Sequence, residues 1–306
     1  MKQIACIIVT FNRRSLLSQC IDHVLTQTFK PTVVYIVDNA SSDGTYDMVI
    51  SKYHLDNHSC SAFVDGVEIR YVRLKENIGG AGGFYTGMKA AYDHGGFGGY
   101  WVMDDDGMPE AQCLEELVKH LRTHDYLSPM VVDVENPDKM SFEYCGEKQA
   151  FLARAHDGIV EGVACPFNGI LYSQRLVEKV GFPKKEMFIW GDEENYSLRC
   201  QHTGFHPVTV VTAVHRHPAN RVQTDTSIFG KVDVAPQMWR CYCRYRNAMY
   251  NWRSEMSFLG KLFVCFNHVW YYLVKKHSVK WTLMYLHAFR DGLKGDFTQL
   301  DKYKFQ

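Results

Sequence analysis

“RLKENIGGAGGFYTG”, residues 73–87, holds five glycines where the hydrophobic pattern changes from that of a strand to that of a helix. Glycine loses more conformational freedom on folding than any other residue and buries no side chain. Such a cluster indicates that something approaches the backbone closely. A dinucleotide-binding loop, a phosphate-binding loop and a tight turn would each explain it, and the position of the stretch in the chain separates these alternatives.

The glycines follow the third predicted strand of the chain. Apolar runs rich in β-branched residues predict strands at 4–9, 32–37, 67–74 and 100–103, and helical spacing follows them at 14–27, 45–53 and 83–94. This alternation predicts an α/β fold with a mostly parallel sheet. The first strand ends in “TFNRR” without a G-x-G-x-x-G motif, which argues against a nicotinamide-dependent dehydrogenase.

The charge of the chain is balanced overall but unevenly distributed. Lys and Arg number 34, as do Asp and Glu, so the composition gives no sign of a nucleic-acid partner. Residues 236–306 carry twelve basic and four acidic residues, which leaves this aromatic-rich region at +8 and the rest at −8. We expect a catalytic domain over 1–235 and a helical region over 236–306 that contacts the anionic head groups of a membrane.

The cysteines and the N-terminus point to a reducing compartment. The ten cysteines form no C-x-x-C pair, so a zinc ribbon is not expected and the thiols are predicted to be buried and free. The first apolar run is too short for a signal peptide and leads directly into a strand. We therefore expect a cytoplasmic protein.

Two acidic clusters stand out. In “YWVMDDDGMPE”, Asp104, Asp105 and Asp106 directly follow a predicted buried strand, where open α/β sheets bind ligands. Asp104 and Asp106 point to the same side of an extended chain and suit one Mg²⁺ or Mn²⁺ ion. The alternative is a solvated acidic turn that caps the next helix.

The second cluster lies in “FIWGDEENYSLRC”. Asp192 and Glu193 open a predicted helix, and Trp190 precedes them. An aromatic ring beside a carboxylate suits a sugar whose hydroxyl must lose a proton, although acids at a helix start also serve as simple caps. Downstream, His215 and His217 alternate along a strand end and could add a metal ligand.

Polar residues at the ends of the first three strands form a third group. Phe11 could stack on a base and Arg13 could clamp a diphosphate. Asp38 ends the second strand, and Asn77 with the glycines follows the third. Carboxyl ends of parallel strands share one edge of a sheet, so we expect these residues to be neighbours.

Taken together, these stretches resemble the inverting glycosyltransferases of family two, which have the GT-A fold. The resemblance covers residues 4–218 and is carried by “IIVTFNR”, “VDNASSDGT”, “ENIGGAGGFYTG”, “MDDDGMPE” and “WGDEENYSLRCQHTGF”. It implies a nucleotide-sugar donor, a divalent ion and a single displacement. The doubled glycines, the triple aspartate and the W-x-D-x-E pattern look most like bacterial galactofuranosyltransferases. Gly191 departs from that group, whose long mycobacterial polymerases carry a second acid there.

The resemblance also assigns roles to residues of this chain. Asp192 is expected to be the general base, and Trp190 with Glu193 to contact the acceptor. The expected metal ligands are Asp104, Asp106 and His215, with His217 as the less favoured alternative to the last. The expected donor contacts are Thr10, Phe11, Arg13, Asp38, Asn77, Gly79, Gly80 and Asp105.

The resemblance implies UDP-galactofuranose as donor and a growing glycan or a polyprenyl-linked saccharide as acceptor, at the inner face of the cell membrane. A rhamnosyltransferase using a deoxythymidine-linked donor is the alternative within the same fold. A non-catalytic carbohydrate-binding module is disfavoured by the intact acidic clusters. The aromatic stretches of residues 260–294 are too short to span a bilayer, and predict either interfacial helices or a helical hairpin at a homo-oligomer interface.

Overall fold

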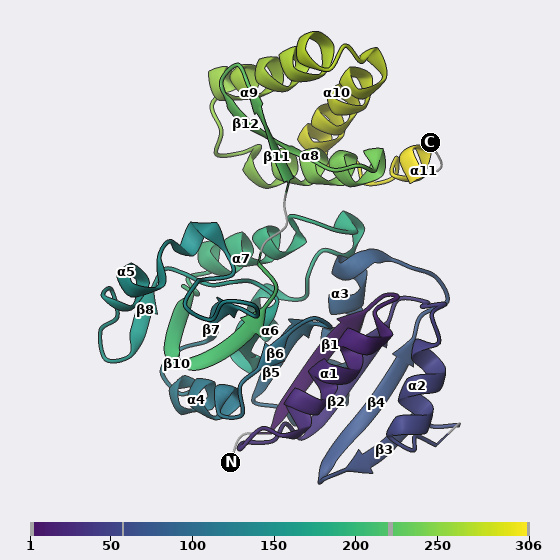
Figure 1. Ribbon diagram of the computed structural model, residues 1–306, viewed down its shortest axis with the longest axis vertical. Helices are drawn as coiled ribbons and strands as arrows, with labels where there is room; N and C mark the ends of the chain where they lie inside the picture. The colour runs from purple at the N-terminus through teal and green to yellow at the C-terminus, as the bar shows by residue number, and fades with distance from the viewer. Residues whose placement is uncertain (1–2, 57, 220–222, 305–306) are drawn as a thin grey trace. The chain divides into compact units, whose positions relative to one another are not determined.

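A computed structural model describes residues 3–56, 58–219 and 223–304. The chain forms two compact units (Figure 1). The sheet unit comprises Met1–Lys185 and Tyr196–Asn220, and the helical unit comprises Glu186–Asn195 and Arg221–Gln306. The segment 186–195, which carries the second acidic cluster, thus groups with the C-terminal helices. The sequence predicted this segment in the catalytic domain, with the division after residue 235.

The sheet unit is an α/β structure. Its helices are α1 (Arg14–Leu25), α2 (Thr45–Lys52), α3 (Gly79–His94), α4 (Cys113–His120), α5 (Lys148–Leu152), α6 (Gln174–Val180) and most of α7 (Asp192–His202). Its strands are β1 (Ile4–Thr10), β2 (Val33–Asp38), β3 (Ser61–Val64), β4 (Val67–Arg73), β5 (Gly99–Asp104), β6 (Met108–Pro109), β7 (Tyr126–Asp133), β8 (Ile159–Glu161), β9 (Asn168–Ser173) and β10 (Val208–His217).

The strands form one mixed sheet in the order β3-β4-β2-β1-β5-β9-β7-β10-β6, with β8 paired to β10. The neighbours β4, β2, β1 and β5 are parallel, as the alternation of strand and helix predicted. In this register Thr10 pairs with Asp38, and Val9 pairs with Asp104. The carboxyl ends of the parallel strands therefore bring the predicted donor residues and the triple aspartate to one edge.

Helices cover both faces of this sheet, which explains the continuous apolar strands. Every residue of β1 and β2 is buried, as expected for strands packed on both sides. One face packs against α1 through Leu17, Ile21 and Val24, and the other packs against α3 through Phe84 and Met88. All the helices and strands predicted from the hydrophobic pattern are confirmed.

The sequence pattern did not resolve the centre of the sheet. Strand β9 lies between β5 and β7 and is antiparallel to both. Its sequence, “NGILYS”, is a short apolar run without alternation. Such a run gives no direction, because strand direction depends on partners far away in the chain.

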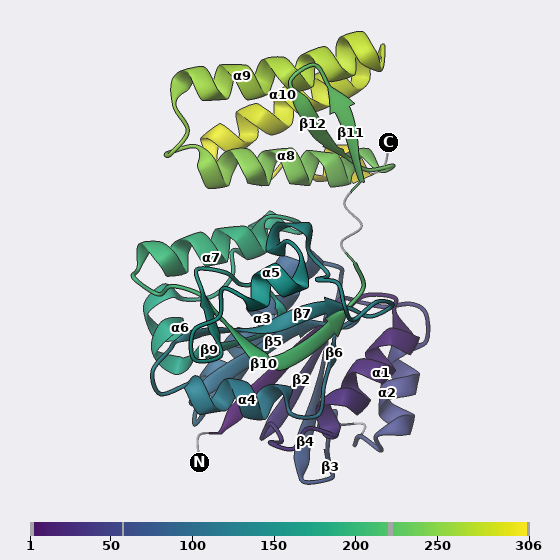
Figure 2. The ribbon, with the colours of Figure 1, turned by 60° about the vertical axis from the view of Figure 1, so that its left-hand side comes forward.

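The helical unit has its own core. It contains the hairpin β11 (Gln223–Ser227) and β12 (Gly230–Val234), then α8 (Met238–Trp252), α9 (Phe258–Trp270), a π-helical turn (Tyr271–Lys275), α10 (Val279–Lys294) and α11 (Asp301–Lys304). Figure 2 shows the hairpin beside α9, where Ser227 Oγ donates to the carbonyl of Asn267 at 3.1 Å. Tyrosines fill much of the interior, Tyr242 and Tyr285 among them.

Candidate active site

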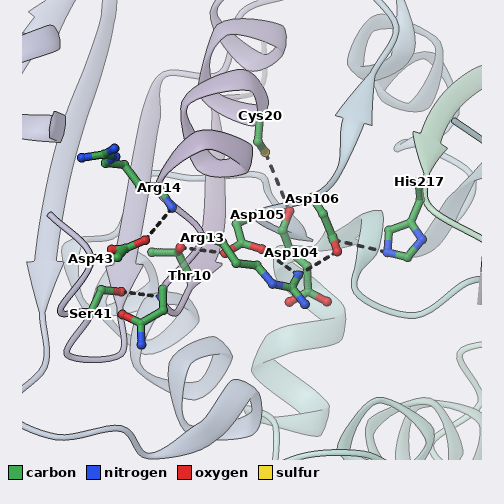
Figure 3. A network of polar contacts seen from close by, with 11 residues as sticks. Thr10, Arg13, Arg14, Cys20, Ser41, Asp43, Asp104, Asp105, Asp106 and His217 are labelled. Carbon is green, nitrogen blue, oxygen red and sulfur yellow. Dashed lines mark hydrogen bonds and ion pairs between the residues drawn. The ribbon is translucent and has the colours of Figure 1, made fainter. Parts of the chain in front are cut away.

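The triple aspartate begins at the end of β5, and its middle carboxylate points inward. Asp105 is 2% exposed. Thr10 Oγ1 donates to its Oδ2 at 2.7 Å, and Arg13 Nη1 donates to its Oδ1 at 3.1 Å (Figure 3). Burial raises the pKa of Asp105 to about 6, although both partners favour the ionised form. The end of β1 thus binds the carboxylate that follows β5.

Arg13 links two of the aspartates. The same Nη1 lies 2.7 Å from Asp106 Oδ2, while about half of the Arg13 side chain stays exposed. Burial lowers the pKa of Arg13, but the charges of Asp105, Asp106 and Asp104 outweigh that effect and raise it. A guanidinium held among carboxylates with one side open is suited to receive a second anion.

Asp106 also faces a histidine at the end of strand β10. His217 Nε2 lies 3.3 Å from Asp106 Oδ1, and the two side chains point toward each other in Figure 3. Burial alone would raise the pKa of Asp106. Its ion pair with His217, together with the charge of Arg13, instead lowers that pKa to about 2.

His215, two residues earlier on β10, lies in a different environment. It is fully buried, and neither ring nitrogen has a hydrogen-bond partner among the residues that the structure describes. A β-carbon at Gly107 would lie 2.6 Å from its Nε2, and one at Gly169 2.7 Å from its Nδ1. Burial lowers the pKa of His215 to about 3, so the ring stays neutral.

The side chains at this site do not by themselves form a complete set of ligands for a divalent ion. Within residues 3–56, 58–219 and 223–304, no three His, Cys, Asp or Glu side chains converge closely enough to hold one. Asp106 and His217 do meet, and an oxygen with an imidazole nitrogen suits Mn²⁺ or Mg²⁺ with open positions. The geometry favours His217 over His215 as the partner of Asp106, whereas sequence analysis preferred His215. The role of Asp104 stays a prediction; its carbonyl accepts from the thiol of Cys20 at 3.7 Å.

The loops after β1 and β2 are joined at the predicted donor end. The amide of Asn12 donates to Ser41 Oγ at 2.9 Å, and the amide of Ser42 donates to Asn12 Oδ1 at 2.7 Å. Phe11 is 42% exposed beside them, as a base-stacking residue must be. Asp38 is fully buried, and its oxygens accept from the hydroxyl of Tyr71 and the amide of Ser41. Its predicted contact with a donor would need these bonds to rearrange.

The glycine stretch has two separate functions in the structure. Helix α3 begins at Gly79, four residues earlier than predicted, and Asn77 Oδ1 accepts from the Gly79 amide at 2.8 Å. A β-carbon at Gly80 would meet no atom within 4 Å, so this part of the backbone is open. At Gly83 a β-carbon would lie 2.4 Å from Val9 Cγ1, and at Gly87 2.5 Å from Ile7 Cγ2. The later glycines therefore allow close packing of α3 on the sheet.

The second acidic cluster lies in the helical unit. Asp192 opens α7 and is 4% exposed. The Glu193 carboxylate accepts from the amide of Gly191 at 3.0 Å, which is a capping contact at the helix start. The guanidinium of Arg240 lies 5.7 Å from the ring centre of Trp190. Two asparagines of α8, Asn247 and Asn251, hold this segment by hydrogen bonds. Neither asparagine could be predicted from the sequence, because two polar residues in a helix give no signal of their own.

Comparison with known proteins identifies the family. The profile of glycosyl transferase family 2 matches residues 5–179, more than half of the chain. The galactofuranosyltransferase GlfT1 of Mycolicibacterium smegmatis is 26% identical over an alignment of 292 positions, and the alignment covers 90% of this chain and 91% of that protein. GlfT1 of Mycobacterium tuberculosis is 25% identical over an alignment of 311 positions that covers 97% of each chain.

Solved structures agree on the fold. The mannosyltransferase PcManGT from Pyrobaculum calidifontis, in complex with GDP-Man and Mn²⁺, superposes with a TM-score of 0.55 at 16% identity, covering 94% of this chain and 74% of that one. TarS 1-349 from S. aureus, in complex with UDP, superposes with a TM-score of 0.51 at 13% identity, covering 97% and 80%. This chain therefore belongs to glycosyl transferase family 2, has the GT-A fold and is a glycosyltransferase.

Proposed function

We propose that this member of glycosyl transferase family 2 transfers galactofuranose from UDP-galactofuranose to a growing cell-surface glycan or a lipid-linked oligosaccharide, with inversion at the anomeric carbon. The observation that carries the choice of sugar is the similarity to proteins named GlfT1 over nine-tenths of both chains. The residues at the carboxyl edge of the sheet support the proposal of a donor site there.

The donor diphosphate is proposed to bind between Arg13 and the loop at Gly79 and Gly80. Arg13 has an exposed side to pair with a phosphate oxygen, and backbone amides at the open start of α3 suit anions. Phe11 would stack on the base. Asp106 and His217 would hold Mn²⁺ or Mg²⁺, which when bound offsets the charge of the diphosphate leaving group.

Asp192 is proposed to act as general base. Its carboxylate would accept the proton of the acceptor hydroxyl as that oxygen attacks the anomeric carbon. The attack comes from the face opposite the diphosphate, so the configuration inverts and no covalent intermediate forms. The bond to the diphosphate oxygen breaks as the bond to the acceptor oxygen forms.

Two measurements test these assignments. Thermal-shift titration with UDP and deoxythymidine-linked sugars, with and without Mn²⁺, should show metal-dependent stabilisation by UDP compounds; a selective response to deoxythymidine-linked rhamnose would overturn the choice of donor. Asp192→Asn should bind UDP with unchanged affinity and lose transfer. Turnover near the wild-type rate in that variant would remove Asp192 from the role of base.

The helical unit carries a surface suited to a lipid interface. We define the α9 surface as the exposed side chains Ile228, Phe229, Phe258, Leu259, Leu262, Phe263 and Phe266. Leu259 is 75% exposed, and the ring of Phe229 at the hairpin tip lies 4.9 Å from that of Phe263, so the hairpin and α9 present one apolar area. Within the described ranges, no helix is both long enough and apolar enough to span a bilayer.

The charge around the α9 surface favours a membrane as its occupant. Residues 257–290 contain five Lys or Arg and no Asp or Glu, although Asp225 pairs with Lys275 and Lys276. A second copy of the chain would bring like charges together, whereas an anionic bilayer attracts them. We therefore propose that the enzyme is peripheral at the inner face of the cell membrane.

Liposome flotation tests the membrane proposal. The intact chain should float with phosphatidylglycerol vesicles, and the double variant L259E/F263E should not. Size-exclusion chromatography of both proteins is the control for oligomers. Equal flotation of the intact chain and the double variant would overturn the proposal. So would an intact chain that binds no lipid and forms a dimer, if the double variant is then a monomer.

A further inference from the structure

The backbone that leads into Asp192 has an unusual conformation. Phe188 has a φ of 70°, Trp190 of 60° and Gly191 of 86°. Residues with a β-carbon rarely adopt such angles, and they persist only where the surroundings hold them. The segment 187–191 therefore needs a partner that fixes its carbonyl groups.

Asn247 provides that partner from the middle of α8. Its Nδ2 lies within hydrogen-bond distance of three carbonyl oxygens, those of Met187 at 3.0 Å, Ile189 at 3.0 Å and Trp190 at 2.6 Å, so its two N–H groups are shared among them. Its Oδ1 accepts from Arg246 Nε at 2.9 Å, which fixes the orientation of the carboxamide. The side chain is fully buried, so no water competes for these bonds.

Asn251, one turn later on the same face of α8, holds the other side of the loop. Its Nδ2 lies 2.9 Å from the carbonyl oxygen of Gly191 and 3.0 Å from Glu194 Oε2. Its Oδ1 accepts from Asn195 Nδ2 at 3.1 Å. The two asparagines thus bind the backbone before Asp192 and the first helical turn after it.

Gly191 belongs to the same arrangement. A β-carbon at this position would lie 3.1 Å from the β-carbon of Asn247, and the positive φ would strain any L residue there. The close approach of the loop to α8 therefore favours glycine.

We infer that Asn247 and Asn251 are positioning residues that hold Asp192 in place for catalysis, so that the C-terminal helices contribute to the reaction as well as to attachment. The inference rests on the proposed function, in which Asp192 is the general base. A displacement of about 1 Å in a reacting group can slow catalysis about 100-fold. The three carbonyl contacts of Asn247 are the restraint against that displacement.

The test is a steady-state comparison of variants in the full chain, with UDP-galactofuranose as donor and a synthetic saccharide acceptor. In Asn247→Asp, an oxygen replaces the donating nitrogen and faces three carbonyl oxygens. We expect kcat to fall about 100-fold, while the KM for the donor and the affinity for UDP stay within twofold. Asn251→Ala, which keeps every Asn247 contact, should lower kcat about tenfold.

Asn267→Ala is the matched control. Asn267 is buried in the same unit, but its Oδ1 accepts from the amide of Phe229 at 3.2 Å and so supports the hairpin. This variant should lower the melting temperature and keep kcat within twofold. Backbone hydrogen exchange at residues 188–191 should accelerate in Asn247→Asp and Asn251→Ala and stay unchanged in the control.

The outcomes separate the inference from the proposed function. If Asp192→Asn is inactive but Asn251→Ala and any folded Asn247 variant keep wild-type kcat, the inference is wrong. If Asp192→Asn is active, the role of Asp192 as base is wrong instead. In the Asp192→Asn background, the asparagine substitutions should lower the residual rate by less than twofold, and a further tenfold loss would show that they act by another route. If Asn247→Asp does not fold, Asn251→Ala decides.

Discussion

Gly87→Ala tests whether the later glycines of the stretch serve helix packing. The added β-carbon would lie 2.5 Å from Ile7 Cγ2 and 2.9 Å from Val37 Cγ2, whereas carbon atoms in contact are normally 3.5–4.0 Å apart. Helix α3 must therefore move about 1 Å from the sheet. Overpacking of this kind costs about 1–3 kcal/mol, and the better helix propensity of alanine offsets up to about 1 kcal/mol. We expect a net loss of about 1–2 kcal/mol.

In a unit of this size, a loss of 1 kcal/mol lowers the melting temperature by about 2–4 °C. Scanning calorimetry should thus show the Gly87→Ala transition about 2–8 °C below that of the wild type, with an unchanged KM for the donor. Gly80→Ala is the matched control, because nothing lies within 4 Å of its β-carbon. It should melt at or slightly above the wild-type temperature, because alanine favours the helix, and it should raise the KM for the donor. Equal melting temperatures for Gly87→Ala and Gly80→Ala would refute the reasoning.

A second substitution checks the mechanism of that loss. Removing the Ile7 side chain beyond the β-carbon deletes the nearest clashing atom, so Ile7→Ala should relieve part of the Gly87→Ala strain. The double variant should then be more stable than the sum of the two single losses by about 1 kcal/mol, a coupling typical of residues in contact. Strict additivity would show that Ile7 is not the obstacle.

Three further predictions concern the acidic site. Asp106→Asn should abolish the Mn²⁺-dependent part of the thermal shift caused by UDP, and an unchanged shift would exclude Asp106 as a ligand. Thr10→Val removes a hydrogen bond to ionised Asp105, so the pKa of Asp105 should rise above about 6 and the acid limb of the pH–rate profile should move up; an unmoved limb would argue against it. Burial lowers the pKa of His215 from 6.5 to about 3. The unfolded chain therefore binds a proton below pH 6.5 that the folded chain does not, and stability is lost as the pH falls from 6.5 toward 3. Between pH 7 and 5 the loss is about 2 kcal/mol, and His215→Gln should lack it in urea titrations.

Much of the candidate site could be read from the order of motifs along the chain. Apolar runs that end in “TFNRR”, “VDNASS” and “VMDDD” predict parallel strands, and parallel strands place their carboxyl ends together. The meeting of Thr10, Arg13 and Asp105 at that edge is confirmed. The order of motifs also argued against a dinucleotide-binding loop, because the glycine stretch follows the third strand and not the first.

The sequence could not predict which individual side chains contact each other. His215 and His217 are two histidines on the same strand, but Gly107 and Gly169 pack around His215, whereas His217 pairs with Asp106. The glycines of α3 divide likewise, since the helical turn decides which of them face β1. Such distinctions depend on side chains that are distant in sequence.

The sequence by itself determined the fold class and the edge of the sheet that carries the site, because hydrophobic periodicity is a local property and parallel strands place their carboxyl ends together. Its motifs determined the resemblance to the family. Tertiary structure alone decided that the Asp192 loop belongs with the C-terminal helices. Asn247 and Asn251 lie more than fifty residues beyond that loop. Their hydrogen bonds to its backbone carbonyls leave no trace in the loop's own sequence except Gly191, because a backbone acceptor is the same in every residue.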